Sequence, residues 1–90
     1  MTWQIEFAAA AKRELEKLDK PVARRIVSFL RERILPLENP RTIAAALKGA
    51  RLGEFWWYRV GAFRIICRIE DNRLVVLVLR VGHRREVYRP

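Results

Sequence analysis

The feature that most constrains the fold is a series of three strand-like segments in the second half of the chain. Residues 54–60, 63–69 and 73–81 are rich in β-branched and aromatic residues, which are typical of strands. Gly61-Ala62 and Asp71-Asn72 separate them, and two-residue breaks of this kind are typical of tight hairpin turns. The sequence therefore predicts three consecutive antiparallel strands.

The first half of the chain shows one strand pattern followed by two helix patterns. Residues 3–7 alternate between apolar and polar, as expected for a short strand with one buried face. Apolar residues then recur at helical spacing over residues 8–18 and again over 22–34. Pro21 suits the first turn of the second helix, and Pro36 closes that helix because proline cannot supply the next backbone donor.

Between the second helix and the strands, Asn39-Pro40 is typical of a helix start, and residues 42–47 are expected to form a short turn of helix that Gly49 ends. The predicted order is β-α-α-β-β-β. This is an α+β fold in which an antiparallel sheet carries a helical hairpin on one face. No linker rich in Gly, Ser or Pro divides the 90 residues, so we expect a single domain over residues 1–90.

The charge of the chain indicates a polyanionic partner. There are 19 Lys and Arg residues against 10 Asp and Glu, a formal net charge of +9. Repulsion among like charges costs stability, so nucleic acid, an acidic protein or an anionic membrane surface is expected to offset it. Arginine greatly outnumbers lysine, and its planar guanidinium group matches the geometry of phosphate.

The sequence argues against several other classes of protein. No apolar run approaches the roughly 18 residues needed to span a membrane, and the first residues lack the basic and apolar regions of a secretory signal. The one cysteine, Cys67, cannot form an internal disulfide, and no group of Cys and His residues has the spacing of a metal site. We expect a cytoplasmic protein that uses no metal, no cofactor and no membrane.

Strand alternation predicts an apolar face and a cationic face of the sheet. Alternate residues of the middle strand are apolar and fall on the side expected to carry the helices. The opposite side carries Phe55, Trp57, Arg59, Arg64 and Arg68. Interleaved cations and rings suit nucleic acid, because guanidinium groups bind phosphates and rings stack on bases. Alternatively, the C-terminal segment covers the two aromatic residues of this face.

Two stretches carry a family resemblance. Residues 59–66, RVGAFRII, and residues 81–88, VGHRREVY, resemble the most recognisable motifs of the RelE/ParE toxin superfamily, commonly written YRVGDYRIIY and VGHRREVY. Residues 10–18 and Leu47-Lys48-Gly49 also fit the family, so the resemblance covers essentially the whole chain. It implies the β-α-α-β-β-β fold and the toxin role in a type II toxin–antitoxin system. The implied partner is an acidic, RelB-like antitoxin that masks the toxin's site and alone brings the complex to operator DNA.

The resemblance implies one of two targets. RelE-like members cleave mRNA in the ribosomal A site without a metal, by attack of a ribose 2′-OH on the adjacent phosphate, and ParE-like members poison DNA gyrase. The basic and tyrosine set of this chain resembles the RelE-like branch. A ribosome-dependent mRNA endoribonuclease that inhibits translation is therefore the main prediction. A gyrase poison, or a weakened homologue that binds only antitoxin or RNA, is the alternative.

The matching motifs also assign site residues by resemblance. Arg64 and Arg84 would hold the scissile phosphate and stabilise its developing charge. His83, with an ordinary pKa of about 6.5, would donate a proton to the leaving 5′-oxygen, and Tyr88 would stack on a base or transfer a proton. The residues expected to bind nucleic acid around them are Lys48, Arg51, Trp57, Arg59, Arg68 and Arg85.

One strand departs from the family pattern. RelE carries lysines at positions that are Phe55 and Trp57 here, and many relatives have Asp where this chain has Ala62. A tryptophan ring can stack on a base, but it cannot neutralise a phosphate. If one of those lysines is the usual general base, weak or altered activity is expected. Lys48, Arg51 and Arg59 are the nearest replacement cations.

Overall fold

The computed structural model describes residues 2–47 and 55–83 of the chain. It confirms the predicted α+β class, with two consecutive helices and one sheet. In chain order the elements are β1 (Gln4–Phe7), α1 (Ala9–Lys17), α2 (Lys20–Phe29), the π-helical turn η1 (Leu30–Ile34), the 3-10 turn η2 (Pro40–Ile43), β2 (Ala45–Ala46), β3 (Phe55–Val60), β4 (Phe63–Glu70) and β5 (Val75–His83). No helix among the described residues is long and apolar enough to cross a membrane.

The sheet has the strand order β1-β5-β4-β3-β2. The predicted antiparallel meander of β3, β4 and β5 is confirmed. The expectation that the whole sheet is antiparallel is wrong at one edge, because β1 pairs with β5 in parallel, from Gln4↔Val75 to Phe7↔Val78. A tight turn dictates the direction of its two strands, but both helices and two strands separate β1 from β5 in the sequence. Turn chemistry therefore leaves the direction of this pairing open.

Two other boundaries differ from the sequence-based expectation. The turn of helix expected over residues 42–47 lies earlier, and Ala45–Ala46 instead form an edge strand on β3. Asn39 opens the 3-10 turn as predicted, since its side-chain oxygen accepts a hydrogen bond from the Arg41 backbone N–H at 3.0 Å. The turn between β4 and β5 is longer than two residues, with Leu74 at a φ of 53°, so β5 begins at Val75.

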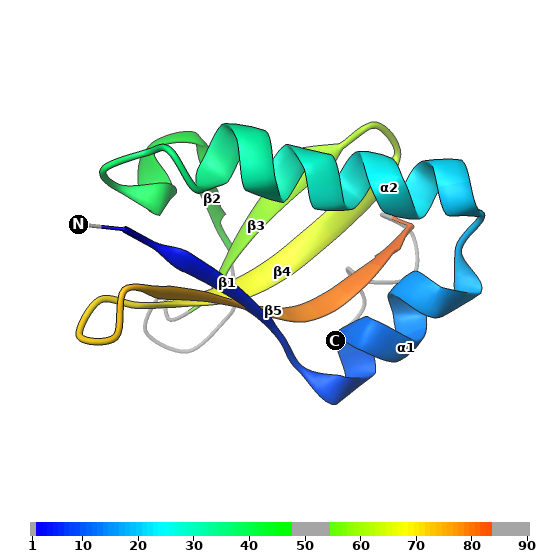
Figure 1. The fold of residues 1–90 in the computed structure, drawn as a ribbon, viewed down its shortest axis with the longest axis horizontal. Coiled ribbons are helices and arrows are strands. Elements are labelled where there is room, and N and C mark those ends of the chain that lie inside the picture. The colour runs from blue at the N-terminus through cyan, green and yellow to red at the C-terminus, as the bar shows by residue number, and fades with distance from the viewer. Residues whose placement is uncertain (1, 48–54, 84–90) are drawn as a thin grey trace.

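Figure 1 shows α2 running across one face of the sheet, with α1 beside β5. The face under α2 is the apolar one, as strand alternation predicted. Its core consists of Trp3, Ala11, Ile26, Leu30, Ile34, Tyr58, Val60, Ile65, Cys67, Ile69, Val76, Val78 and Val81. The ring of Phe29 meets the ring of Tyr58 edge to face at 5.9 Å, which joins α2 to β3. We refer to the opposite face of the sheet as the outer face.

Tyr58 joins the core to the segment that follows the helices. Its side chain is 1% exposed, and its hydroxyl donates a 2.6 Å hydrogen bond to the carbonyl of Pro40. Burial raises the pKa of the Tyr58 hydroxyl, so the phenol stays protonated and keeps donating. This bond explains why the chain near Pro40 turns tightly against the sheet, although its sequence alone also suits a longer helix.

Candidate functional site

The first part of the candidate site lies on the outer face of the β3–β4 hairpin. Trp57 pairs with Ile66, and Arg59 pairs with Arg64, so Arg64 and Trp57 are diagonal neighbours on one face. The guanidinium carbon of Arg64 lies 4.0 Å from the centroid of the Trp57 ring. At this distance the negative face of the ring attracts the cation. The stack restricts where the guanidinium group of Arg64 lies on the outer face.

The same face concentrates further positive charge. Arg59 is exposed and lies directly opposite Arg64. Like charges in such positions destabilise a sheet, and no packing requirement explains them here. Arg68 is also exposed, with its guanidinium carbon 6.0 Å from the ring centroid of its strand partner Phe55. The pairing confirms that these residues share one face, and their charge indicates a surface for an anionic ligand.

Phe55 and Trp57 are each half-buried on the outer face. In the described part of the chain, their cationic neighbours are Arg68 and Arg64, stacked on their rings. The C-terminal segment, which is the alternative cover for these rings, lies outside the described residues. Both aromatic residues therefore support the arginines from below the level of a bound chain, whichever group lies above them.

His83 is not on the outer face. It pairs with Phe63 at the end of β5, and the two rings meet edge to face at 5.9 Å. Residues opposite each other in a pair share a face, and Val81, two residues before His83, is buried under the helices. Arg64 instead faces outward opposite Gly82, which places no side chain beside it. The structure therefore does not bring His83 and Arg64 together on one face.

A carboxylate that sequence reasoning missed lies next to His83. Glu14 of α1 accepts a 2.8 Å hydrogen bond from the Val81 backbone N–H through Oε1, and Oε2 accepts a 2.9 Å hydrogen bond from Arg80 Nε. Burial opposes ionisation of Glu14, but these two donors outweigh it and hold the pKa of the carboxyl below its ordinary value. A cavity of about 360 Å³ adjoins this contact and reaches His83.

Glu14 has a clear structural role at the edge of the sheet. The pairing of β1 with β5 ends at Phe7↔Val78, and the Ala8 N–H still donates to the Val78 carbonyl at 2.8 Å. Beyond that point β5 has no neighbouring strand on this side within the described residues. The carboxylate of Glu14 replaces that strand at Val81 and so fixes the end of β5, which leads into the C-terminal motif.

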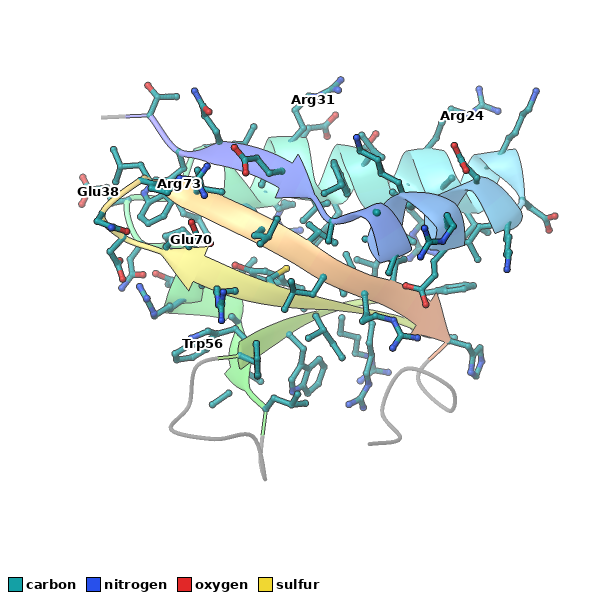
Figure 2. All side chains as sticks on the ribbon, turned by 90° about the horizontal axis from the view of Figure 1, so that it is seen from below. Arg24, Arg31, Glu38, Trp56, Glu70 and Arg73 are labelled. Atoms are coloured by element: carbon teal, nitrogen blue, oxygen red, sulfur yellow. The ribbon has the colours of Figure 1, made fainter. Side chains whose placement is uncertain are left out.

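Most of the described acidic side chains near the sheet gather at its other end. Arg41 and Asp71 form a bidentate pair at 3.0 and 2.7 Å, and Arg73 contacts both Glu70 and Glu6. Figure 2 shows Glu70 and Arg73 at that end of the sheet. These pairs neutralise the turn between β4 and β5. The positive charge that remains is concentrated at the β3–β4 turn and on the outer face.

Five predicted site residues lie outside the described residues. They are Lys48, Arg51, Arg84, Arg85 and Tyr88. Within the described ranges, no group of three or more His, Cys, Asp and Glu side chains is arranged to hold a metal ion. Cys67 is fully buried in the core, and burial raises the pKa of its thiol, so it takes no part in this surface.

The comparisons with known proteins agree with this geometry. Residues 5–88 match the family described as the ParE toxin of the type II toxin–antitoxin system parDE. The chain is 30% identical over 89 residues to Toxin RelG of Mycobacterium tuberculosis, covering 99% of each sequence. It is 29% identical over 84 residues to a RelE-like toxin protein described as putative from Escherichia coli, covering 93% of this chain and 85% of the relative.

Solved structures show the same fold. The toxin–antitoxin complex RelBE2 from Mycobacterium tuberculosis contains a chain that superposes with a TM-score of 0.81 at 27% identity, covering 93% of this chain and 100% of that one. The isolated Escherichia coli RelE toxin superposes with a TM-score of 0.72 at 28% identity, covering 96% and 90%. The match extends over nearly the entire chain in both cases, and this chain therefore belongs to the RelE/ParE family of type II toxins.

Proposed function

We propose that this toxin is a metal-independent endoribonuclease that cleaves mRNA on the ribosome and thereby inhibits translation in the cytoplasm. The relatives named RelG and RelE support this branch of the family over others. The observation that carries the proposal is the stack of Arg64 on Trp57, with Arg59 directly across the strand pair. It presents a guanidinium group in a restricted position on a surface rich in positive charge.

The proposed reaction needs charge stabilisation more than any other contribution. Attack of the 2′-oxygen on the neighbouring phosphorus forms one P–O bond and breaks the bond to the 5′-oxygen, which leaves a cyclic 2′,3′-phosphate and a 5′-hydroxyl end. The intermediate carries additional negative charge on the phosphate oxygens. A preorganised guanidinium group stabilises that charge without reorganising during the reaction. Arg64 is the described residue that best fits this role, because the ring of Trp57 holds it on the outer face.

The two proton transfers are less well matched to the described residues. One proton leaves the 2′-oxygen and another reaches the 5′-oxygen, each with the help of a positioned acid or base. His83, the predicted donor, emerges on the opposite face from Arg64. We therefore assign His83 to this step only if the RNA passes around the end of the sheet beside Gly82. Arg84 and Tyr88 remain the other proposed members of the site.

Primer extension on mRNA in a reconstituted translation mixture tests the proposal. The variants are Arg64→Gln, which removes the charge, and Arg64→Lys, which keeps it but loses the planar fork. We expect ribosome-dependent cuts by the wild type, and a loss of about 10²–10³-fold in rate for Arg64→Gln, as for removal of one stabilising donor in other enzymes. Arg84→Ala should cause a similar loss.

Arg24→Gln is the matched control, because Arg24 is an exposed arginine of α2 on the other side of the molecule (Figure 2). It should cut at the wild-type rate. Intact mRNA in the presence of wild-type toxin and translating ribosomes would contradict the proposal. Cutting that survives unchanged in Arg64→Gln would remove Arg64 from the site.

Inhibition of DNA gyrase is the second candidate function. The observation that favours it is the match of residues 5–88 to a family described as ParE toxins. A supercoiling assay with purified gyrase separates the two candidates, since growth arrest with intact mRNA and inhibited supercoiling would support this function. We also propose an acidic, RelB-like antitoxin as the partner, because several similar solved chains come from RelB–RelE complexes. Co-expression with an adjacent short acidic reading frame should abolish toxicity.

A further inference from the structure

We propose that Arg25 and Arg59 form a second phosphate-binding point at the β3–β4 turn, which holds the RNA backbone away from the scissile bond. Arg25 belongs to α2, and neither the sequence motifs nor the proposed reaction assigns it a role. This inference rests on the proposed function, since it extends the RNA surface of that site around the tip of the hairpin. The argument begins with the glycine of the turn.

Gly61 is the point at which the two arginines meet. Its φ is +60°, a backbone conformation that side chains other than glycine rarely adopt. A β-carbon at this position would lie 3.2 Å from Nη1 of Arg25 and 3.6 Å from both its Cζ and its Nη2. The guanidinium group of Arg25 therefore occupies the space that a side chain would need. It is held against the turn from the helix side.

Arg59 approaches the same glycine from the outer face. Its Nε donates a long hydrogen bond, 3.4 Å, to the carbonyl oxygen of Gly61. Two guanidinium groups from different elements thus converge on one residue, although each carries a full positive charge. Both side chains belong to exposed residues. Such an arrangement costs stability through repulsion unless an anion lies between or beside the two groups.

The arginines that the protein neutralises itself lie elsewhere. Arg41, Arg73 and Arg80 each form an ion pair with a carboxylate. Over residues 2–47 and 55–83, no ion pair involves Arg25 or Arg59. The structure therefore provides counter-charges for other arginines but not for those at this turn, which points to an external anion.

Phosphate of an RNA chain is the anion that best fits the position. A guanidinium group binds phosphate through two parallel N–H donors, and the turn places two such groups close together. Arg59 is also directly opposite Arg64, so the turn continues the surface that carries the Arg64–Trp57 stack. A single-stranded backbone bound at Arg64 would reach the turn within the width of one strand pair.

Binding of an RNA that cannot be cleaved tests this inference directly. The probe is a short single-stranded RNA with 2′-O-methyl groups, and its affinity is measured by fluorescence anisotropy between about 50 and 200 mM salt. Each phosphate contact that is lost should reduce the slope of log K against log salt by about 0.7. We expect this reduction for Arg25→Gln and for Arg59→Gln, and about twice that reduction for the double variant. Arg25→Lys should retain most of the slope because it retains the charge.

Arg24→Gln is again the matched control, since Arg24 precedes Arg25 on the same helix and is equally exposed. Its slope should equal that of the wild type. A reduction in Arg24→Gln as large as in Arg25→Gln would show that only net charge matters and would overturn the inference. So would unchanged slopes in Arg25→Gln and Arg59→Gln, or no RNA binding by the wild type. Weaker binding to an acidic antitoxin with unchanged RNA slopes would assign the turn to protein recognition instead.

The result is separable from that of the proposed function. Ribosome-dependent cutting by the wild type together with unchanged salt slopes would leave the nuclease in place and remove the second phosphate-binding point. Reduced slopes with no cutting by the wild type would keep the RNA surface and remove the nuclease. Thermal melting of each variant confirms that the comparison is made between folded proteins.

Discussion

Removal of the Glu14 carboxylate should loosen the end of β5 by an amount that the structure allows us to calculate. In Glu14→Ala, the Val81 N–H loses its acceptor, and Val81 is 1% exposed. An unsatisfied buried donor costs about 1–3 kcal/mol. The adjoining cavity of about 360 Å³ admits water, which favours the lower half of that range. The side chain of Arg80 is 51% exposed, so loss of its ion pair adds only about 0.5 kcal/mol.

The expected total for Glu14→Ala is therefore about 1.5–2.5 kcal/mol of lost unfolding free energy. Glu14→Gln keeps an oxygen acceptor for Val81 and loses only the charge, so it should cost about 0.5 kcal/mol. Urea denaturation of the isolated toxin measures both values. For a domain of this size the midpoint of Glu14→Ala should fall by about 1–2 M. Equal losses in the two variants would refute the assignment of the Val81 hydrogen bond as the dominant contribution.

The same carboxylate makes stability depend on pH. The pKa of Glu14 lies below its ordinary value of 4.5 in the folded protein, so the unfolded chain binds the proton more readily. The stabilisation is fully present above pH 4.5 and is lost as the pH falls through the lowered folded pKa. Glu14→Gln should remove this part of the acid sensitivity. Parallel pH profiles for the wild type and Glu14→Gln would contradict the assignment.

Two further results are expected. Tyr58→Phe keeps the ring packed against Phe29 but leaves the Pro40 carbonyl without its 2.6 Å hydrogen bond, so it should cost about 1–2 kcal/mol in urea denaturation, and a cost near zero would show that water replaces the hydroxyl. Cys67 should not react with a thiol reagent until the protein unfolds, because the side chain is fully buried and burial raises its pKa; rapid labelling of the native protein would show that the core opens locally.

Much of the fold could be predicted because its signals are local. The two helices follow from apolar residues at helical spacing, and the meander follows from strand patterns separated by short turns such as Gly61-Ala62. The faces of β3 and β4 also follow from alternation, since side chains of a strand point to opposite sides in turn. Arg59, Arg64 and Arg68 were therefore assigned correctly to the face opposite the helices.

The candidate site could be predicted only in part. The alternation rule would also have placed His83 on the helix side, opposite to Arg64, but the family motif favoured a shared site for both. The role of Glu14 had no signal in the sequence, because its partner Arg80 lies 66 residues away. A weak signal did exist for Gly61, whose place in a tight turn suggests a positive φ. Nothing in the spacing of residues indicated that Arg25 would occupy the space beside it.

The sequence by itself determined which segments become helices and strands, which face of the hairpin is charged, and the family to which the chain belongs. These properties depend on the order of neighbouring residues, which periodicity and motifs record. Only the tertiary structure decided the parallel pairing of β1 with β5, the support of β5 by Glu14, and the convergence of Arg25 and Arg59 on Gly61. Each of these contacts joins residues far apart in the chain or on different elements. Their energies depend on how the packed core positions whole elements, and no local pattern encodes that geometry.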